Sequence, residues 1–549
     1  MPTDHTAAVL AYHQRSKHRL DRYAPGPETL DWDAQPDPFR RFAGAPLTRL
    51  PLPADDEKAG WRELFSPGAI TPHAATLKSV GLLLELSFAL SGWKALGPDR
   101  WAMRCNPSSG NLHPTEVYLL ASGLAYLDDG LYHYAPKEHG LEQRALLSRP
   151  PGGANTPRLL VGFSSIHWRE AWKYGERAFR YCQLDMGHAI GALRYAAAVL
   201  GWRMQEVALS HAEIAGLLGL DRTEDFANAE REEPEAVFEL LLAPTIPTMP
   251  ETPAEPANWL SGAAWCGQAN RLDRRPMYRW PVIDAVAQAS RRSLRQAVAP
   301  LPALAPRRLL PDTRVAAATL IRSRRSAQRF DRRARLDAAR FWPMLAALMP
   351  QTGEGLATIP WDAGSMANMK PAVHAVLFAH RIDGLEPGAY LLPRHASALP
   401  ALQAALPHLN WRPAEGAPPE VPLHELVQNP ALAGTLRTLS CHQAIAADAV
   451  FVVAMLAEFK APLGQAPGRY RELLQEAGLM GQVLYLEAEA AGLRGTGIGC
   501  YFDDPVHELL GFTGKAPDTW QVLYHFSVGL PVADARITSF PPYDQEARP

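Results

Sequence analysis

The sequence lacks the features that mark membrane and exported proteins. Its 549 residues contain no run approaching the roughly 20 consecutive apolar residues of a membrane-spanning helix. The first 20 residues mix histidine, arginine and lysine, without the apolar core of a secretory signal. We therefore expect a soluble, cytoplasmic protein with no membrane partner.

The sequence also has little net charge and few cysteines. Lysine and arginine number 55 against 57 acidic residues, and the formal net charge of −2 removes the electrostatic case for a nucleic-acid partner. The cysteines are odd in number, widely spaced and never in a CxxC pair, which argues against a disulfide framework and against a zinc site. Reduced thiols are expected at Cys105, Cys182, Cys266, Cys441 and Cys500.

The most informative segment that is present is a polar turn, Asn106-Pro107-Ser108-Ser109-Gly110-Asn111. His113, Pro114 and Glu116 follow it, and the apolar run Val117 to Ala121 predicts a buried strand directly afterwards. Amides, hydroxyls and a carboxamide gathered at the end of a strand suit the edge of a polar heteroaromatic ring. The alternative is an ordinary surface turn.

An internal repeat organises the rest of the chain. Asn111-Leu-His-Pro returns as Asn368-Met-Lys-Pro, 368 − 111 = 257 residues later, and Gly130-Leu-Tyr returns as Gly388-Ala-Tyr. Further along, the separation grows to 471 − 180 = 291 residues, with matches at Arg180 and Arg471, Gly187 and Gly478, Ala197 and Ala488, and Gly201 and Gly492. The separation of 291 residues is larger than the first separation of 257, which places an insertion in the second copy. We expect this insertion at residues 396–430, as a surface excursion.

The repeat sets the predicted domains. We expect an N-terminal segment (1–76), a first domain (77–243), a Pro-rich linker with a connecting helix over 283–298 (244–311), and a second domain (312–549). Apolar runs predict strands at Leu159–Phe163, Val237–Leu242, Val450–Met455 and Val522–Val528, set among long helices. The fold class is therefore α+β, with one core in each half.

One helix in each half is rich in small residues. These segments, residues 187–200 and 477–491, alternate glycine and alanine with larger side chains. Small side chains let helix axes approach closely, so the two helices are expected to form an interface with pseudo-twofold symmetry. The alternative is that alanine is simply a good helix former.

The polar turn resembles the flavin-edge loop of the nitroreductase superfamily, and the longer pattern through Glu116 resembles its SagB-type azoline dehydrogenase branch. Nitroreductases are dimers with long central helices and flavins in the interface. The resemblance covers most of residues 77–536, and it implies a nitroreductase-like fold in which two homologous halves form an intramolecular pseudo-dimer.

The two halves retain different parts of the flavin site that this resemblance implies. Arg324-Arg325-Ser326 in the second half resembles the element that binds the flavin phosphate, since two guanidinium groups and a hydroxyl suit a phosphate dianion. Residues 83–91, the corresponding part of the first half, contain no arginine. Conversely, residues 362–368 of the second half have lost the Pro-Ser-Ser pattern of Pro107, Ser108, Ser109 and Asn111. We therefore expect one FMN per chain. FMN is favoured over FAD because no Rossmann fingerprint or other adenosine-binding element is present.

Two further elements complete the implied cofactor site. Gly492-Leu-Arg-Gly-Thr-Gly497-Ile498-Gly499 resembles the backbone strip over one flavin face, and its glycines are expected to permit positive φ and close approach to a planar ligand. Arg536 is expected to supply a further phosphate arginine. Its alternative is a charged residue of the C-terminal tail.

A Lys173-Tyr174 pair follows His167-Trp168-Arg169 and bears on catalysis. In SagB-type azoline oxidases a Lys-Tyr pair of this setting is implicated in proton removal. A tyrosine needs a nearby cation and a dry site to act as a base near pH 7, and Lys173 or Arg177 could provide that cation. The alternative is the charged first turn of the following helix.

Other polar residues favour structural roles. His188 is expected to be a packed histidine with a hydrogen-bonded ring nitrogen, and Asp503-Asp504 a helix cap, with no metal site. Cys500 is close enough to the glycine strip to touch a flavin, although a small core residue is the usual role of a free cysteine. Cys441-His442 is not expected to form a nucleophilic pair, because adjacent residues on a strand point to opposite faces.

The sequence thus predicts an FMN-dependent oxidoreductase. The preferred reaction is dehydrogenation of a thiazoline or oxazoline in a modified peptide, by hydride transfer to flavin N5, with a peptide-modifying protein as a potential partner. Two alternatives stay open. One is an NAD(P)H-dependent reductase of nitro compounds or quinones, and the other is a non-catalytic scaffold or peptide-binding protein.

Overall fold

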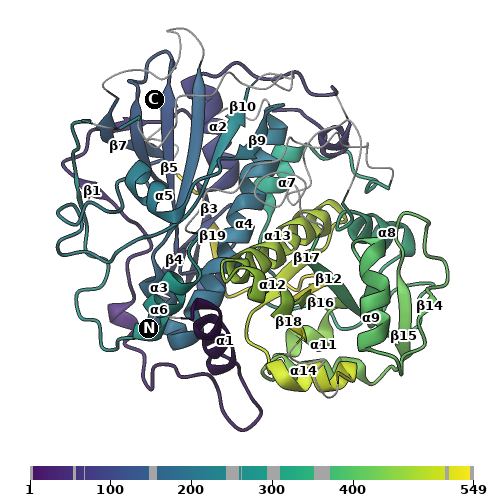
Figure 1. The fold of residues 1–549 in the computed structure, drawn as a ribbon. Helices are drawn as coiled ribbons and strands as arrows, with labels where there is room; N and C mark the ends of the chain where they lie inside the picture. The colour runs from purple at the N-terminus through teal and green to yellow at the C-terminus, as the bar shows by residue number, and fades with distance from the viewer. Residues whose placement is uncertain are drawn as a thin grey trace.

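The structure is a computed structural model that describes residues 4–52, 57–66, 68–147, 157–242, 259–260, 262–292, 309–350, 371–512 and 519–543 (Figure 1). The degraded second copy of the polar turn, residues 362–368, lies outside these ranges. No helix within them has the length and apolar content needed to cross a membrane.

Two antiparallel seven-stranded sheets form the framework. The first has the order β2-β7-β6-β5-β8-β10-β9 and the second the order β14-β15-β13-β12-β16-β18-β17. The strands of the first are β2 (Leu47–Arg49), β5 (Thr115–Ser122), β6 (Gly130–Ala135), β7 (Gly140–Leu146), β8 (Arg158–Ser165), β9 (Arg203–Glu206) and β10 (Glu233–Leu241). Those of the second are β12 (Val373–Ala379), β13 (Gly388–Leu392), β14 (Arg412–Pro413), β15 (His424–Gln428), β16 (Phe451–Glu458), β17 (Arg494–Ile498) and β18 (Trp520–Gly529).

Six strands occupy equivalent positions in the two sheets. In chain order, β5, β6, β7, β8, β9 and β10 correspond to β12, β13, β15, β16, β17 and β18. The repeated Gly-x-Tyr motif also makes the same contacts in both sheets. Tyr132 Oη donates to Asp128 O at 2.6 Å, and Tyr390 Oη donates to Glu386 O at 2.7 Å. The repeat seen in the sequence is therefore a repeat of strand order and of local structure.

The central strands are apolar on both faces because each face is covered. In β16, Val453 and Met455 belong to the large central core, whereas Val452 and Ala454 belong to a second cluster on the opposite face. Successive side chains of a strand point to opposite faces, so a strand buried on both sides gives the continuous apolar run seen in the sequence. The four predicted strands are confirmed in β8, β10, β16 and β18.

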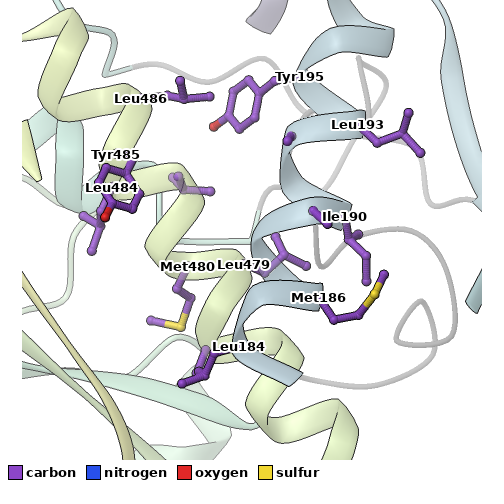
Figure 2. Packing of buried hydrophobic residues seen from close by; sticks show 14 of the residues in the cluster. Leu184, Met186, Ile190, Leu193, Tyr195, Leu479, Met480, Leu484, Tyr485 and Leu486 are labelled. Carbon is purple, nitrogen blue, oxygen red and sulfur yellow. The ribbon is translucent and has the colours of Figure 1, made fainter. Parts of the chain in front are cut away.

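Two 22-residue helices, α4 (Ala178–Val199) and α13 (Arg469–Ala490), lie side by side at the centre of the molecule (Figure 1). Figure 2 shows the buried apolar side chains around their contact. A Cβ atom on Gly187 would overlap the carbonyl oxygen of Gln475, and one on Gly478 would overlap that of Leu184. Gly187 and Gly478 are equivalent in the repeat, as are Leu184 and Gln475, so the contact is reciprocal. The glycines are required because the helix backbones touch.

The remaining helices cover the sheets and connect them. They are α1 (His5–Arg15), α2 (Leu77–Ser87), α3 (His167–Tyr174), α5 (His211–Leu218), α6 (Pro281–Ala289), α7 (Ala317–Ser323), α8 (Ala338–Ala346), α9 (Leu399–Ala405), α10 (Leu432–Leu439), α11 (Ala444–Asp448), α12 (Lys460–Gln465) and α14 (Asp503–Leu510). Two small sheets add β1 (Phe42–Ala43) with β11 (Gln268–Ala269), and β3 (Leu90–Leu96) with β4 (Asp99–Arg104) and β19 (Thr538–Phe540).

Two predictions about connecting segments need correction. Within the predicted linker, the connecting helix is α6, which begins at Pro281 and ends at Ala289, and its Ile283 and Val286 are buried in the central core. The predicted surface excursion contains α9 and the strands β14 and β15, and Leu402 and Leu426 in it are buried. In the second of these segments apolar residues are spaced among prolines and polar residues, so its helix and strands were not predicted.

The N-terminal segment joins both parts of the molecule. Its strand β2 extends the first sheet beside β7. Its helix α1 reaches the other part, where His13 hydrogen-bonds to Tyr470 Oη at 3.1 Å and to Gln521 Oε1 at 2.9 Å.

Candidate functional site

A cavity of about 340 Å³ collects most of the predicted site residues. Its lining combines the turn Asn106–Asn111, which we call the ring-edge loop, with Arg324–Ser326 after α7 and with residues 496–500 at the end of β17. The ring-edge loop connects β4 to β5, so the first sheet positions it. The cavity therefore contains elements from distant parts of the chain, and its volume is in the range of ligand sites.

The ring-edge loop is held by its own polar side chains. Ser108 Oγ accepts from His113 N at 2.8 Å, and Asn111 Nδ2 donates to Ala102 O at 2.9 Å. Gly110 and Asn111 both have positive φ, +60° and +62°. The hydroxyl oxygens of Ser108 and Ser109 therefore bind within the protein. Gly110 is the exposed residue of the loop, at the position where a ligand edge can approach.

Asp185 on α4 holds the ring-edge loop through hydrogen bonds to Ser109. Its carboxylate accepts from Ser109 N at 3.0 Å and from Ser109 Oγ at 2.9 Å, and it also lines the cavity. Burial raises the pKa of Asp185 to about 7, although the serine hydrogen bonds oppose this shift. Asp185 therefore changes its proton occupancy near neutral pH.

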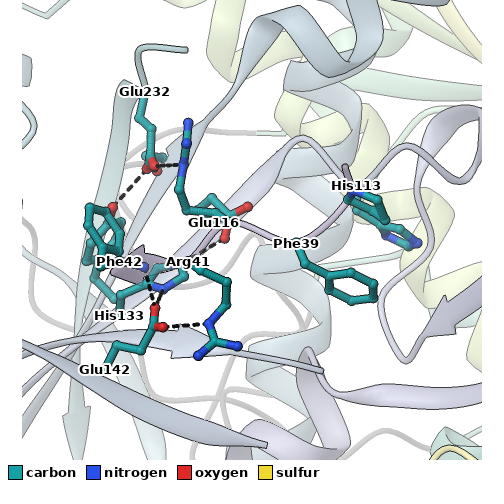
Figure 3. A network of polar contacts seen from close by, with 12 residues as sticks. Phe39, Arg41, Phe42, His113, Glu116, His133, Glu142 and Glu232 are labelled. Carbon is teal, nitrogen blue, oxygen red and sulfur yellow. Dashed lines mark hydrogen bonds and ion pairs between the residues drawn. The ribbon is translucent and has the colours of Figure 1, made fainter. Parts of the chain in front are cut away.

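A buried polar network fixes the far end of the loop (Figure 3). Glu116 forms an ion pair with Arg169 of α3 and accepts from His133 Nε2 at 2.9 Å, and His133 Nδ1 in turn contacts Glu142 at 2.9 Å. Arg169 Nη1 also donates to His113 O at 2.7 Å. Because Arg169 belongs to α3, the network ties α3 to the ring-edge loop.

Lys173 and Tyr174 lie in the last turn of α3 and reach the ring-edge loop. A Cβ atom on Gly110 would lie 2.6 Å from Tyr174 Oη and 3.3 Å from Lys173 Nζ. Tyr174 lines the cavity, and Lys173 Nζ lies 5.4 Å from the centre of the Tyr174 ring. The structure thus brings the predicted pair together beside the loop.

The electrostatics of this pair differ from the expectation of an acidified tyrosine. Burial, followed by the Glu170 carboxylate, raises the pKa of Tyr174 well above its ordinary value, and burial lowers the pKa of Lys173. Arg177, the other expected cation, is engaged elsewhere, because its Nη1 donates to Asp503 at 2.8 Å. Without a ligand, Tyr174 is therefore a protonated hydrogen-bond donor at neutral pH.

The arginines after α7 also line the cavity. Arg324 Nε donates to Cys105 O at 2.8 Å, and Arg325 Nη2 donates to Ser91 O at 2.6 Å. Arg324 Nη1 is buried and has no hydrogen-bond partner. Ser326 Oγ lies 2.8 Å from Tyr485 Oη.

The cavity carries more positive than negative charge. Lys94, Arg104, Arg324 and Arg325 line it, whereas Asp185 is the sole carboxylate among its described lining residues. Burial lowers the pKa of all four cations, and the Arg324 guanidinium lowers that of Arg325 further. An anion in the cavity would relieve this repulsion and supply Arg324 Nη1 with an acceptor.

The glycine strip lines the cavity through Gly497, Ile498 and Gly499, but for a reason other than the predicted one. Of the described glycines in the segment, Gly492 alone has positive φ, at the end of α13. A Cβ atom on Gly497 would overlap Tyr524, and one on Gly499 would overlap Tyr181. These glycines are required because aromatic side chains pack against the strip.

Other predicted residues are placed as follows. Arg536 is 76% exposed at its side chain and pairs with Asp534, so it does not line the cavity. His188 is a packed histidine, as expected, and contacts Gln482 at 3.3 Å and Tyr524 at 3.2 Å.

Asp503 is not the N-cap of α14. It lies in the first turn and binds Arg177 and Arg180, both at 2.8 Å.

Sequence reasoning missed several lining residues. The cavity is also lined by four residues that belong to segments interpreted for other reasons or not at all: Asp185, Lys94, Arg104 and Gln443. The available signal was Asp185 itself, the one carboxylate in the sequence of α4. Among the described residues, no group of three metal-binding side chains is present.

This architecture, two equivalent sheets with a cationic cavity near paired central helices, defines a nitroreductase-like α+β fold. Residues 321–530 match the nitroreductase family model. The chain shares its fold over nearly its whole length with a crystal structure from Anabaena variabilis provisionally named a nitroreductase. The match has 19% identity and a TM-score of 0.62 and covers 96% of this chain and 99% of that one.

Two further proteins match over shorter regions. A provisionally named nitroreductase of Methanocaldococcus jannaschii is 25% identical over 130 residues, 22% of this chain and 64% of its own length, so this chain spans less than two thirds of that relative. The NADPH:FMN oxidoreductase of Vibrio harveyi, solved with NAD⁺, aligns over 39% of this chain and 68% of its own, with 17% identity and a TM-score of 0.24.

Proposed function

We propose that this protein is an FMN-dependent oxidoreductase with one flavin site, built from two homologous halves that form an intramolecular pseudo-dimer. The observation that carries the proposal is that Pro107–Asn111 and Arg324–Ser326 line one cavity. Each element was expected to be the surviving part of a site whose counterpart in the other half is degraded. Their convergence is what a single composite site requires.

The pseudo-dimer rests on three relationships. The two sheets share the order of six strands, the Gly-x-Tyr motifs make equivalent hydrogen bonds, and Gly187 and Gly478 make reciprocal contacts across α4 and α13. Reciprocal contacts are the property of an isologous twofold interface. A duplicated and fused dimer accounts for all three.

The described residues fit FMN. Arg324, Arg325 and Ser326 would hold the phosphate, since two guanidinium groups and a hydroxyl match a dianion and Arg324 Nη1 lacks an acceptor. The ring-edge loop and residues 497–499 would flank the ring system. When bound, FMN would supply a two-electron acceptor at N5.

The chain's own residues would remove the proton from the substrate. In the preferred reaction, dehydrogenation of a thiazoline or oxazoline in a modified peptide, a base must remove a proton while hydride leaves the ring. The Lys173-Tyr174 pair beside Gly110 is the proposed acid–base group. Burial lowers the pKa of Lys173 and raises that of Tyr174, so both shifts favour the uncharged forms, an amine that can accept a proton and a phenol that can donate a hydrogen bond.

The second candidate is an NAD(P)H-dependent reductase of nitro compounds or quinones. The specific observation in its favour is the raised pKa of Tyr174, caused first by burial, because a hydride donor such as NAD(P)H needs no base. Anaerobic bleaching of the flavin by NAD(P)H, without substrate, would favour this reading. A colourless protein that cannot be reconstituted with FMN would favour a scaffold instead.

The test of the proposal combines stoichiometry and product analysis. FMN released from the denatured protein should approach one per chain, and two per chain would contradict the composite site. An azoline-containing peptide incubated with the enzyme should lose two hydrogens by mass spectrometry. If this happens only when a peptide-modifying protein is added, that protein is a required partner.

A further inference from the structure

Two cysteines that the proposed oxidoreductase chemistry does not use meet at the wall of the cavity. Cys500 follows β17 and lines the cavity, and Cys441 lies in the turn after α10. Their Sγ atoms are 2.7 Å apart, and both residues are half-buried. A disulfide bond is about 2.05 Å long, so well under 1 Å of movement would join them.

The turn that carries Cys441 is fastened to Cys500. Gln443 Nε2 donates to Ser440 O at 2.9 Å and to Cys500 O at 3.1 Å. Cys441 and His442 both have positive φ, +52° and +61°, in a region that costs non-glycine residues free energy. The fold therefore maintains an unfavourable backbone conformation that brings one thiol to the other.

The surroundings of Cys500 favour its thiolate. The Cys441 thiol, and after it a hydrogen bond from His18, lower the pKa of Cys500 to about 5, against the opposing effect of burial. His18 Nδ1 accepts from Ala24 N at 2.9 Å, so the other nitrogen of the neutral ring carries the hydrogen. The Arg177 guanidinium, bound to Gly499 O at 3.0 Å, adds positive charge nearby.

We propose that Cys441 and Cys500 form a dithiol–disulfide couple that reacts with low-molecular-weight disulfides entering the cavity, with Cys500 as the nucleophile and Cys441 as the resolving thiol. The Cys500 thiolate attacks one sulfur of the external disulfide, which forms a mixed disulfide and releases one thiolate. Cys441 then loses its proton and attacks Cys500 Sγ, which forms the internal disulfide and releases the second thiolate. The two protein thiols are oxidised, the external disulfide is reduced to two thiols, and no flavin takes part.

The other cysteines provide contrast. Cys105 and Cys182 are buried, and burial raises the pKa of both thiols. Cys266 is half-buried like the pair, but its Sγ lies 3.0 Å from Gln143 O and it does not line the cavity. Cys266→Ser is therefore the matched control for a half-buried cysteine outside the couple.

The experiment uses the reduced full-length protein and glutathione disulfide as the probe. Acid quenching, alkylation and peptide mass spectrometry should find a peptide pair linked through Cys441 and Cys500, with two glutathiones released per chain. Cys441→Ser should stop at a glutathione adduct on Cys500 with one glutathione released. Cys500→Ser should give neither product, and Cys266→Ser should behave as the wild type.

A second measurement covers the case in which a substitution disturbs folding. In the unmodified protein, Cys500 should be alkylated by iodoacetamide at pH 6 at least tenfold faster than Cys266. An alkylation rate at Cys500 no higher than at Cys266, or the absence of the linked peptide in excess glutathione disulfide, would overturn the proposal. Neither readout requires bound FMN, so failure here is distinct from failure of the proposed function.

Discussion

Gly187 on α4 packs directly against the backbone carbonyl of Gln475 on α13, and no side chain fits between them. Gly187→Ala would force the helices apart, and overpacking of this kind costs about 1 to 3 kcal/mol of unfolding free energy. Urea denaturation measures the change. Gly434→Ala in α10 is the matched control, because a Cβ atom there meets nothing within 4 Å and alanine favours helix. Equal stability of the two variants would contradict the close approach of α4 and α13.

The arginines after α7 are predicted to hold the flavin phosphate. Replacing Arg324 and Arg325 by alanine removes charge-assisted hydrogen bonds worth about 1.5 to 3 kcal/mol each, so FMN should bind on the order of 10²- to 10⁴-fold more weakly. Fluorescence titration with FMN measures this, and circular dichroism checks the fold. Arg322→Gln is the control, since the Arg322 side chain pairs with Glu85 and does not line the cavity. Retention of yellow colour by the double variant would refute the assignment.

Tyr174→Phe separates the two candidate reactions. Loss of the phenol should slow anaerobic flavin reduction by an azoline substrate by about 10²- to 10⁴-fold, because the acid–base pair is broken. Reduction by NAD(P)H, which needs no base, should persist in the same variant. Tyr126→Phe serves as a control, as Tyr126 is 95% exposed. Equal losses with both reductants would assign Tyr174 a structural role, and no loss with either would favour the reductase.

Asp185 should make stability depend on pH. Burial raises its pKa from 3.8 to about 7 in the folded protein. Between these values the folded state binds more protons than the unfolded state, so the contribution of Asp185 to the unfolding free energy falls as pH rises from about 4 to about 7 and then stays constant. Asp185→Asn removes this contribution. The stability difference, variant minus wild type, should therefore increase over that pH interval in urea titrations, and a flat difference would contradict the raised pKa.

The sequence predicted the elements whose signal is local. The apolar runs of β8, β10, β16 and β18 and the small-residue stretches of α4 and α13 could be read directly, because burial on both faces and close helix contact each impose a composition. The N-terminal turns of both helices were missed. Their charged residues, such as Arg180 and Arg471, are buried by partners distant in sequence, Asp503 and Glu235.

The candidate site was predictable only where a motif carried it. The ring-edge loop, Arg324 and Tyr174 were found through their resemblance to a known pattern, and they line one cavity. Lys94 contributes one charge from an otherwise ordinary strand, β3, and no local pattern distinguishes it. Arg536 illustrates the reverse case, in which a suitable residue type near the end of the chain is held at the surface by Asp534.

The composite lining of the cavity also imposes an order on biosynthesis. Arg324 donates to the carbonyl of Cys105, 219 positions earlier, and Tyr524 completes the wall close to the end of the chain. A nascent chain that has emerged only as far as β10 can form the first sheet, but it has neither the arginines nor the glycine strip. Capture of a ligand by this cavity must therefore follow translation of almost the entire polypeptide. A chain truncated before Tyr524 would lack the complete cavity.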